Sequence, residues 1–111
     1  MSEEGDFVAL LLAKLRSDPG GSGWPDTCDY DERTRTARLT YRQPEGGSRE
    51  VRLELPASGV RDFLDRLADE NDVLDVWGPG VSLVEGAARF ATIYLQERVA
   101  TTRDDPLVIR Y

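Results

Sequence analysis

Histidine is missing from this sequence, and cysteine occurs once, as Cys28. Without histidine, the chain cannot activate a serine or cysteine nucleophile through an imidazole, and zinc loses its commonest nitrogen ligand. A lone cysteine forms no internal disulfide, and an unpaired thiol fits a reducing compartment. We therefore expect a cytoplasmic protein that is not an enzyme and that binds no cofactor or metal.

Positive charge and long apolar runs are also scarce. The 14 basic residues stand against 21 acidic ones, which gives a net charge of −7, and this charge repels the backbone of a nucleic acid. No apolar run approaches the ~20 residues of a membrane span, and the acidic start MSEEGD lacks the positive charge of an export signal. The sequence thus predicts no nucleic-acid partner and no membrane partner.

The residues that are present suffice for one folded domain. The chain has 111 residues, of which 40% are hydrophobic, so residues 1–111 are predicted to form a single globular domain. Apolar residues recur at helical spacing over roughly residues 3–17, after Pro56, and over about Leu83–Thr101. Ser58 is a candidate N-cap for the second of these helices.

Between the first two helices the apolar period changes to two. This alternation predicts three half-buried strands, around Cys28–Asp31, Ala37–Arg42 and Glu50–Leu55. Cys28 falls on the inward side of its strand, where a thiol is usually an inert, small apolar group.

The register of these strands should follow from their apolar residues. A slip of one residue would turn each apolar set into water, so the apolar residues of neighbouring strands must share a face. For the second and third strands this rule pairs Leu39 with Leu53 and leaves a loop of Glu45-Gly46-Gly47, in which a glycine can supply a positive φ.

The same register predicts a charged row across the outer face of the sheet, made of Asp29, Arg38 and Glu54. Exposed charge pairs contribute only tenths of a kcal/mol each. We therefore favour a solvated sheet face over a docking surface, and a face bearing Arg38, Arg42 and Arg52 is the next surface to test if other sites fail.

The stretch LDVWGPGVSLVEGAARF, residues 74–90, comes nearest to a phosphate-binding motif. Leu83 stands where a dinucleotide fingerprint needs its third glycine, and Ala87 stands where a phosphate loop needs lysine. Ser82 and Glu85 instead fit a capping box, and the Gly-Pro-Gly before them is turn chemistry. The segment is predicted to be a turn that starts a helix.

Acidic residues gather after the second helix, at Asp69, Glu70, Asp72 and Asp75. The spacing approaches that of a calcium loop, but the alternation breaks at Val73 and the turn glycine is replaced by Leu74, so we predict no metal site. Trp77 follows closely. Carboxylates that steer a basic partner, beside a tryptophan that supplies contact area, are typical of a protein-binding patch.

The distribution of charge supports this interpretation. Residues 33–52 hold six arginines and two glutamates, whereas residues 57–80 hold six acidic residues and two arginines. The predicted partner-binding residues are therefore Asp69, Glu70, Asp72, Asp75 and Trp77. Because tryptophan is highly buried on average, the alternative that Trp24 and Trp77 belong to the core stays open.

Together these patterns predict an α+β fold in the order α-β-β-β-α-(β)-α-(β), with optional strands at 72–77 and 106–111. An antiparallel sheet of three to five strands is expected, packed on one face by about three helices. The predicted function is a small, acidic, non-enzymatic protein-binding module, such as an immunity-type inhibitor or adaptor, with a basic partner and with a homodimer allowed. The alternative is a small-ligand binder or carboxylate-dependent hydrolase, with a pocket between helix 83–101 and the sheet.

Overall fold

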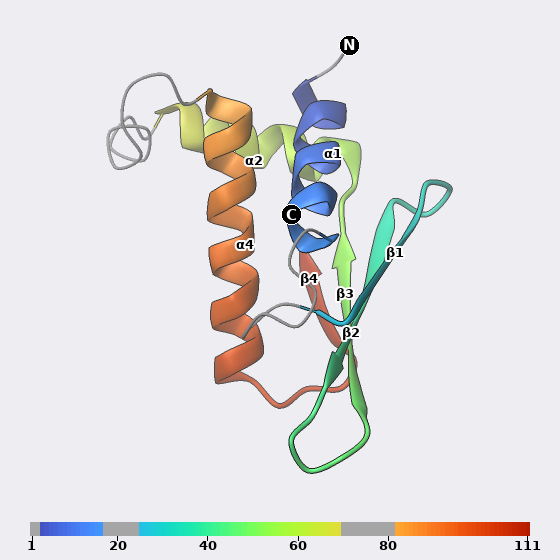
Figure 1. The fold of residues 1–111 in the computed structure, drawn as a ribbon. Helices are drawn as coiled ribbons and strands as arrows, with labels where there is room; N and C mark the ends of the chain where they lie inside the picture. The colour runs from blue at the N-terminus through green and yellow to red at the C-terminus, as the bar shows by residue number, and fades with distance from the viewer. Residues whose placement is uncertain (1–2, 17–24, 70–81) are drawn as a thin grey trace.

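Three helices lie on one side of a four-stranded sheet in a computed structural model, which describes residues 3–16, 25–69 and 82–111 (Figure 1). In chain order the elements are α1 (Glu3–Arg16), β1 (Thr27–Asp31), β2 (Thr36–Arg42), β3 (Ser48–Glu54), α2 (Ala57–Asp69), α4 (Leu83–Thr101) and β4 (Leu107–Arg110). The α+β class and the strand near the C-terminus are confirmed. The optional strand at 72–77 lies outside the described residues.

The sheet is mixed, and the prediction of an antiparallel sheet is wrong in this respect. Its strand order is β1-β2-β3-β4, with antiparallel pairs from β1 to β3 and a parallel pair between β3 and β4. The reason lies in the connection from β3 to β4, which includes α4: this helix has 19 residues and carries the chain back by roughly 28 Å. The chain therefore enters β4 at the end where β3 began, and parallel strands need such a crossover.

The predicted register is correct for the first strand pair and wrong by two residues for the second. Tyr30 faces Ala37 as expected. In the second pair, however, Leu39 faces Val51 and Ala37 faces Leu53. A shift of two residues keeps each apolar side chain on the inner face, so alternation alone does not detect it.

Proline explains this shift. In the predicted register Pro44 would pair with Ser48, but proline has no N–H to donate to the sheet. The chain instead turns over residues 43–47, where the Gln43 N–H donates to the Gly47 carbonyl at 3.2 Å and the φ angles of Gly46 and Gly47 are +94° and +81°. Only glycine adopts such angles at little cost.

The helix boundaries follow the sequence more closely. Helix α4 begins and ends at the predicted residues, and the Ser82 hydroxyl accepts a hydrogen bond from the Glu85 N–H at 3.1 Å, as in a capping box. The Glu85 carboxylate accepts from Arg89 at 3.1 Å, one turn along the helix. Helix α2 begins at Ala57, so Ser58 lies inside the helix and the prediction of Ser58 as N-cap is wrong.

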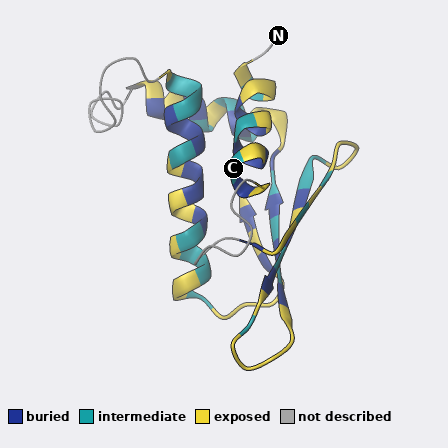
Figure 2. Ribbon diagram, in the orientation of Figure 1, coloured by how far each residue is buried: buried dark blue, intermediate teal, exposed yellow. Residues whose placement is uncertain are grey.

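The core lies between the sheet and the helices (Figure 2). Its largest fully buried side chains come from every helix and from β2, β3 and β4: Phe7, Leu11, Leu15, Leu39, Leu53, Leu55, Leu64, Leu95, Leu107, Val51 and Val60. Among the described helices, none is both long and apolar enough to span a membrane.

Candidate functional site

The residues predicted to bind a partner begin where α2 ends. Asp69 is the last residue of that helix, whereas Glu70, Asp72, Asp75 and Trp77 lie outside the described residues, as does Trp24. The acidic patch and its basic partner therefore stay a prediction.

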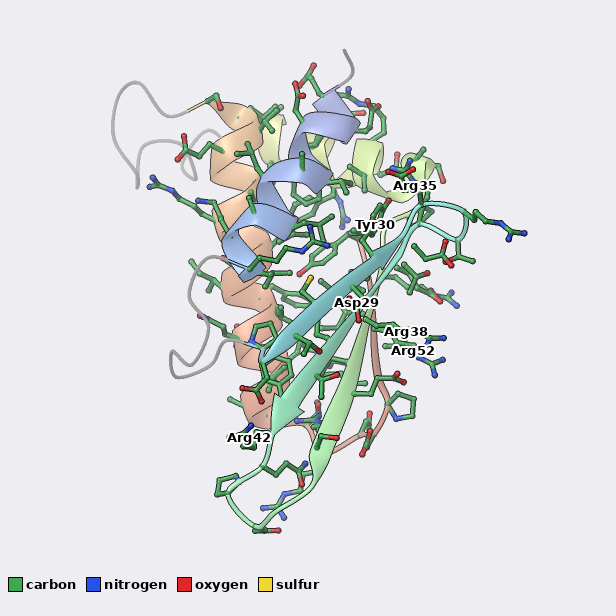
Figure 3. The ribbon with its side chains drawn as sticks, turned by 45° about the vertical axis from the view of Figure 1, so that its right-hand side comes forward. Asp29, Tyr30, Arg35, Arg38, Arg42 and Arg52 are labelled. Atoms are coloured by element: carbon green, nitrogen blue, oxygen red, sulfur yellow. The ribbon has the colours of Figure 1, made fainter. Side chains whose placement is uncertain are left out.

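The outer face of the sheet carries a charged row that differs from the predicted one. Asp29 lies beside Arg38, but Arg38 faces Arg52 and not Glu54 (Figure 3). The Arg52 guanidinium pairs with Glu50 of its own strand at 2.9 Å, and Glu54 pairs with Arg110 at 2.5 Å. Since these groups are half-exposed or exposed and carry charges of both signs, the face fits a solvated surface better than a docking surface.

A groove of about 350 Å³ lies where α2, α4 and the end of β4 meet. Helical periodicity brings the residues of each helix to the groove, because residues three or four apart share one face. The end of β4 and the residue that follows it complete the lining. The residues that line this aromatic groove are Phe63, Arg66, Leu67, Phe90, Tyr94, Arg110 and Tyr111.

The floor of the aromatic groove is a cluster of rings around Tyr111. The centroid of the Tyr111 ring lies 5.5 Å from that of Phe63 and 6.2 Å from that of Tyr94, both in edge-to-face geometry, which is favourable for aromatic pairs. The Tyr111 hydroxyl donates to the Ala91 carbonyl at 2.6 Å. Burial raises the pKa of Tyr111 far above its usual range. The floor is thus built from fixed, neutral groups.

The rim of the aromatic groove is apolar and positively charged. Phe90 and Tyr94 remain 38% and 42% exposed, although both are large and apolar for most of their surface. Arg110 pairs with Glu54, whereas Arg66 has no ion pair or hydrogen bond within the described part of the chain. Two guanidinium groups beside four rings suit an apolar group that carries a carboxylate.

Sequence reasoning missed this groove because it comes from three distant segments. The apolar residues of α4 cover a wide arc of the helix, and the structure divides that arc: Ala87, Ala91 and Leu95 are buried, whereas Phe90, Ile93 and Tyr94 face solvent. The usable signal was the excess of large apolar residues over what one sheet face can cover.

Cys28 is partly buried and packs against the core, in agreement with its predicted inward position. Desolvation raises the pKa of the Cys28 thiol, and the neighbouring Arg16 guanidinium offsets part of this effect. The Arg16 Nε donates to the Cys28 carbonyl at 3.3 Å. A thiol whose pKa is raised is less reactive than an ordinary one.

The lining of the aromatic groove, as far as the structure describes it, contains no side chain with a carboxylate or a thiol. Within residues 3–16, 25–69 and 82–111, no group of three or more His, Cys, Asp or Glu side chains lies close enough to hold a metal ion. Comparison with protein-family models, with curated proteins and with solved structures finds no match.

Proposed function

We propose that the protein is a non-enzymatic protein-binding module, an adaptor or inhibitor, whose aromatic groove binds a partner segment with a large apolar side chain next to a carboxylate. The observation that carries this proposal is Arg66, which has no ion pair or hydrogen bond with the other described residues, beside the exposed rings of Phe90 and Tyr94. Exposed apolar surface gathered in one place is typical of interaction sites. Aromatic anchors with arginine are the side chains that contribute most to protein interfaces.

Charge supports an acidic segment as the occupant. The aromatic groove presents Arg66 on a protein whose net charge is −7, beside Arg110, whose charge is already paired with Glu54, so Arg66 offers a local positive site. A carboxylate that reaches the Arg66 guanidinium gains charge-assisted hydrogen bonds, which are stronger than neutral ones. The predicted contact between the acidic residues at 69–77 and a basic surface is a separate proposal, and it would involve another part of the partner. The cytoplasm is the compartment proposed from the single, unpaired thiol.

A small-ligand binder is the second candidate, because about 350 Å³ lies within the range of pockets that hold small molecules. The two candidates differ in where the binding energy comes from. A small aromatic carboxylate such as 3-phenylpropionate, titrated calorimetrically, would bind as tightly as any peptide if the groove served a small ligand. We expect it to bind far more weakly, because a partner segment also covers the exposed rings on the rim.

The proposal is tested by selecting random peptides displayed on phage against the full chain. We expect enrichment of peptides with a large apolar residue next to Asp or Glu. In calorimetric titrations Arg66→Glu should weaken these peptides by tenfold or more, since a charge-assisted hydrogen bond contributes about 1.5–3 kcal/mol.

Arg38→Glu is the matched control, because it makes the same change in net charge on the outer sheet face. If both variants lost the same affinity for the peptides, the effect would come from the net charge of the protein and not from a contact with Arg66. Peptides that bind Arg66→Glu as well as the unchanged protein would overturn the proposal.

A further inference from the structure

Helix α4 exposes a second row of side chains that the aromatic groove does not use. Phe90 and Tyr94 form the row that lines the groove, whereas Arg89, Ile93 and Glu97 form the adjacent row, each one turn from the next. Ile93 is 50% exposed, more than any other large apolar side chain in the described part of the chain. A surface helix normally carries polar residues at such a position.

The charges beside Ile93 have opposite signs at its two ends. Arg89 lies one turn before Ile93, and its side chain is 40% exposed, with Nη2 3.1 Å from the Glu85 carboxylate. Glu97 lies one turn after Ile93 and is exposed. Its carboxylate has no ion pair or hydrogen bond with the other described residues. The hydroxyl of Thr101 donates to the backbone carbonyl of Glu97 and not to its side chain.

We propose that this row binds the same row of a second copy of the chain, in an antiparallel arrangement with a two-fold axis at Ile93. In this arrangement Ile93 packs on its equivalent, and Arg89 of each copy faces Glu97 of the other. Along the row the order is positive, apolar, negative, and this order is self-complementary, because an antiparallel copy presents the negative end to the positive one. A two-fold interface requires this property, since the same patch serves both partners.

Packing geometry agrees with this occupant. Rows of residues four apart are the ridges that most often interlock between helices of globular proteins. None of the three residues of the row lines the groove, although the row adjoins Phe90 and Tyr94 along α4. The dimer therefore leaves Arg66 and Tyr111 accessible, and its formation goes beyond the peptide binding proposed above.

Sedimentation velocity over micromolar to millimolar concentrations tests the dimer. We expect the unchanged protein to shift from monomer to dimer with concentration, and Ile93→Glu to remain monomeric. Val108→Glu is the matched control, because Val108 is 42% exposed on the sheet, and it should dimerise like the unchanged protein. A protein that stays monomeric at the highest concentration, or whose dimer survives Ile93→Glu, would overturn the proposal.

Charge reversal tests the arrangement within the dimer. Arg89→Glu and Glu97→Arg should each raise the dissociation constant about tenfold, because each places like charges at two symmetric positions. The double variant restores both pairs with the signs exchanged, so it should dimerise like the unchanged protein. Failure of the double variant to recover the dimer would overturn the antiparallel pairing.

Discussion

Arg49 is a charged residue on the inner face of the sheet, and it is 7% exposed. Its Nε donates to the Asp104 carbonyl at 2.9 Å, its Nη1 to the Val99 carbonyl at 2.9 Å, and its Nη2 to the Thr102 hydroxyl at 3.1 Å. The planar guanidinium thus satisfies three acceptors at the end of α4 from one position on β3. A buried charge is costly unless hydrogen bonds of this kind compensate for the lost water.

Arg49→Lys should lower the free energy of unfolding by about 2–3 kcal/mol, because the single ammonium group of lysine cannot reach all three acceptors that the planar guanidinium reaches. Urea denaturation measures this change. Arg42→Lys is the control, since Arg42 is exposed on the adjacent strand and its guanidinium makes no hydrogen bond with the other described residues, whereas its backbone N–H donates to Asp26. The free energy of unfolding of Arg42→Lys should fall by less than about 0.5 kcal/mol. Similar losses at both positions would contradict the role given to Arg49.

At the scale of elements, the sequence predicted those parts that local chemistry determines. The bounds of α4 follow from its periodicity and from the hydroxyl of Ser82, which satisfies a free N–H of the first turn. The faces of the strands follow from alternation. The β2–β3 register does not, because it depends on which residues form the turn, and there the missing N–H of Pro44 decides.

The candidate site was less predictable than the elements that build it. Phe63, Phe90 and Tyr111 lie in three elements, and no local pattern states that their rings meet. Arg49 was missed for a similar reason, since a charged residue before an apolar alternation looks like a strand end. Contacts between distant segments decide both features, and sequence periodicity reports only one segment at a time.

The packing of α2 against the C-terminal segment depends on Gly59. A Cβ atom at this position would lie 2.0 Å from the Tyr111 carbonyl oxygen, so the backbones approach too closely for any side chain. In an ordinary helix, replacing glycine by alanine stabilises by about 1 kcal/mol.

Gly59→Ala should instead destabilise the protein, by about 2 kcal/mol, because α2 or Tyr111 must move. Thermal and urea denaturation measure the loss, and near-ultraviolet circular dichroism reports the ring cluster. Ser58→Ala, at an exposed position in the same turn, should change stability by less than about 0.5 kcal/mol. A stabilised Gly59→Ala variant would show that the close approach does not exist.

For the whole molecule, ionisation of buried tyrosines limits stability in alkali. Burial raises the pKa of Tyr41 to about 12, an effect that the neighbouring Cys28 increases and Arg49 reduces. Burial also raises the pKa of Tyr111. The unfolded chain ionises its tyrosines near pH 10, whereas the folded chain keeps these two protonated. The stabilisation is therefore complete below pH 10 and is lost as the pH rises towards 12.

Urea denaturation at a series of pH values should show this decline, and Tyr41→Phe should make it shallower because phenylalanine carries no proton to lose. Burial also raises the pKa of the Cys28 thiol. The comparison is therefore made in a Cys28→Ala background, which removes that contribution. Equal slopes above pH 10 with and without the Tyr41 hydroxyl would contradict the prediction.

The parallel pairing of β4 with β3 has a consequence for synthesis on the ribosome. Arg110 pairs with Glu54 across 56 residues of chain, and at about 5–20 residues per second the β1–β3 meander waits roughly 3–11 s for its last strand. During that interval the edge of β3 that later pairs with β4 has no neighbouring strand. Nascent chains would then be vulnerable to wrong pairing, and a chaperone that shields β3 would act before Tyr111 closes the core.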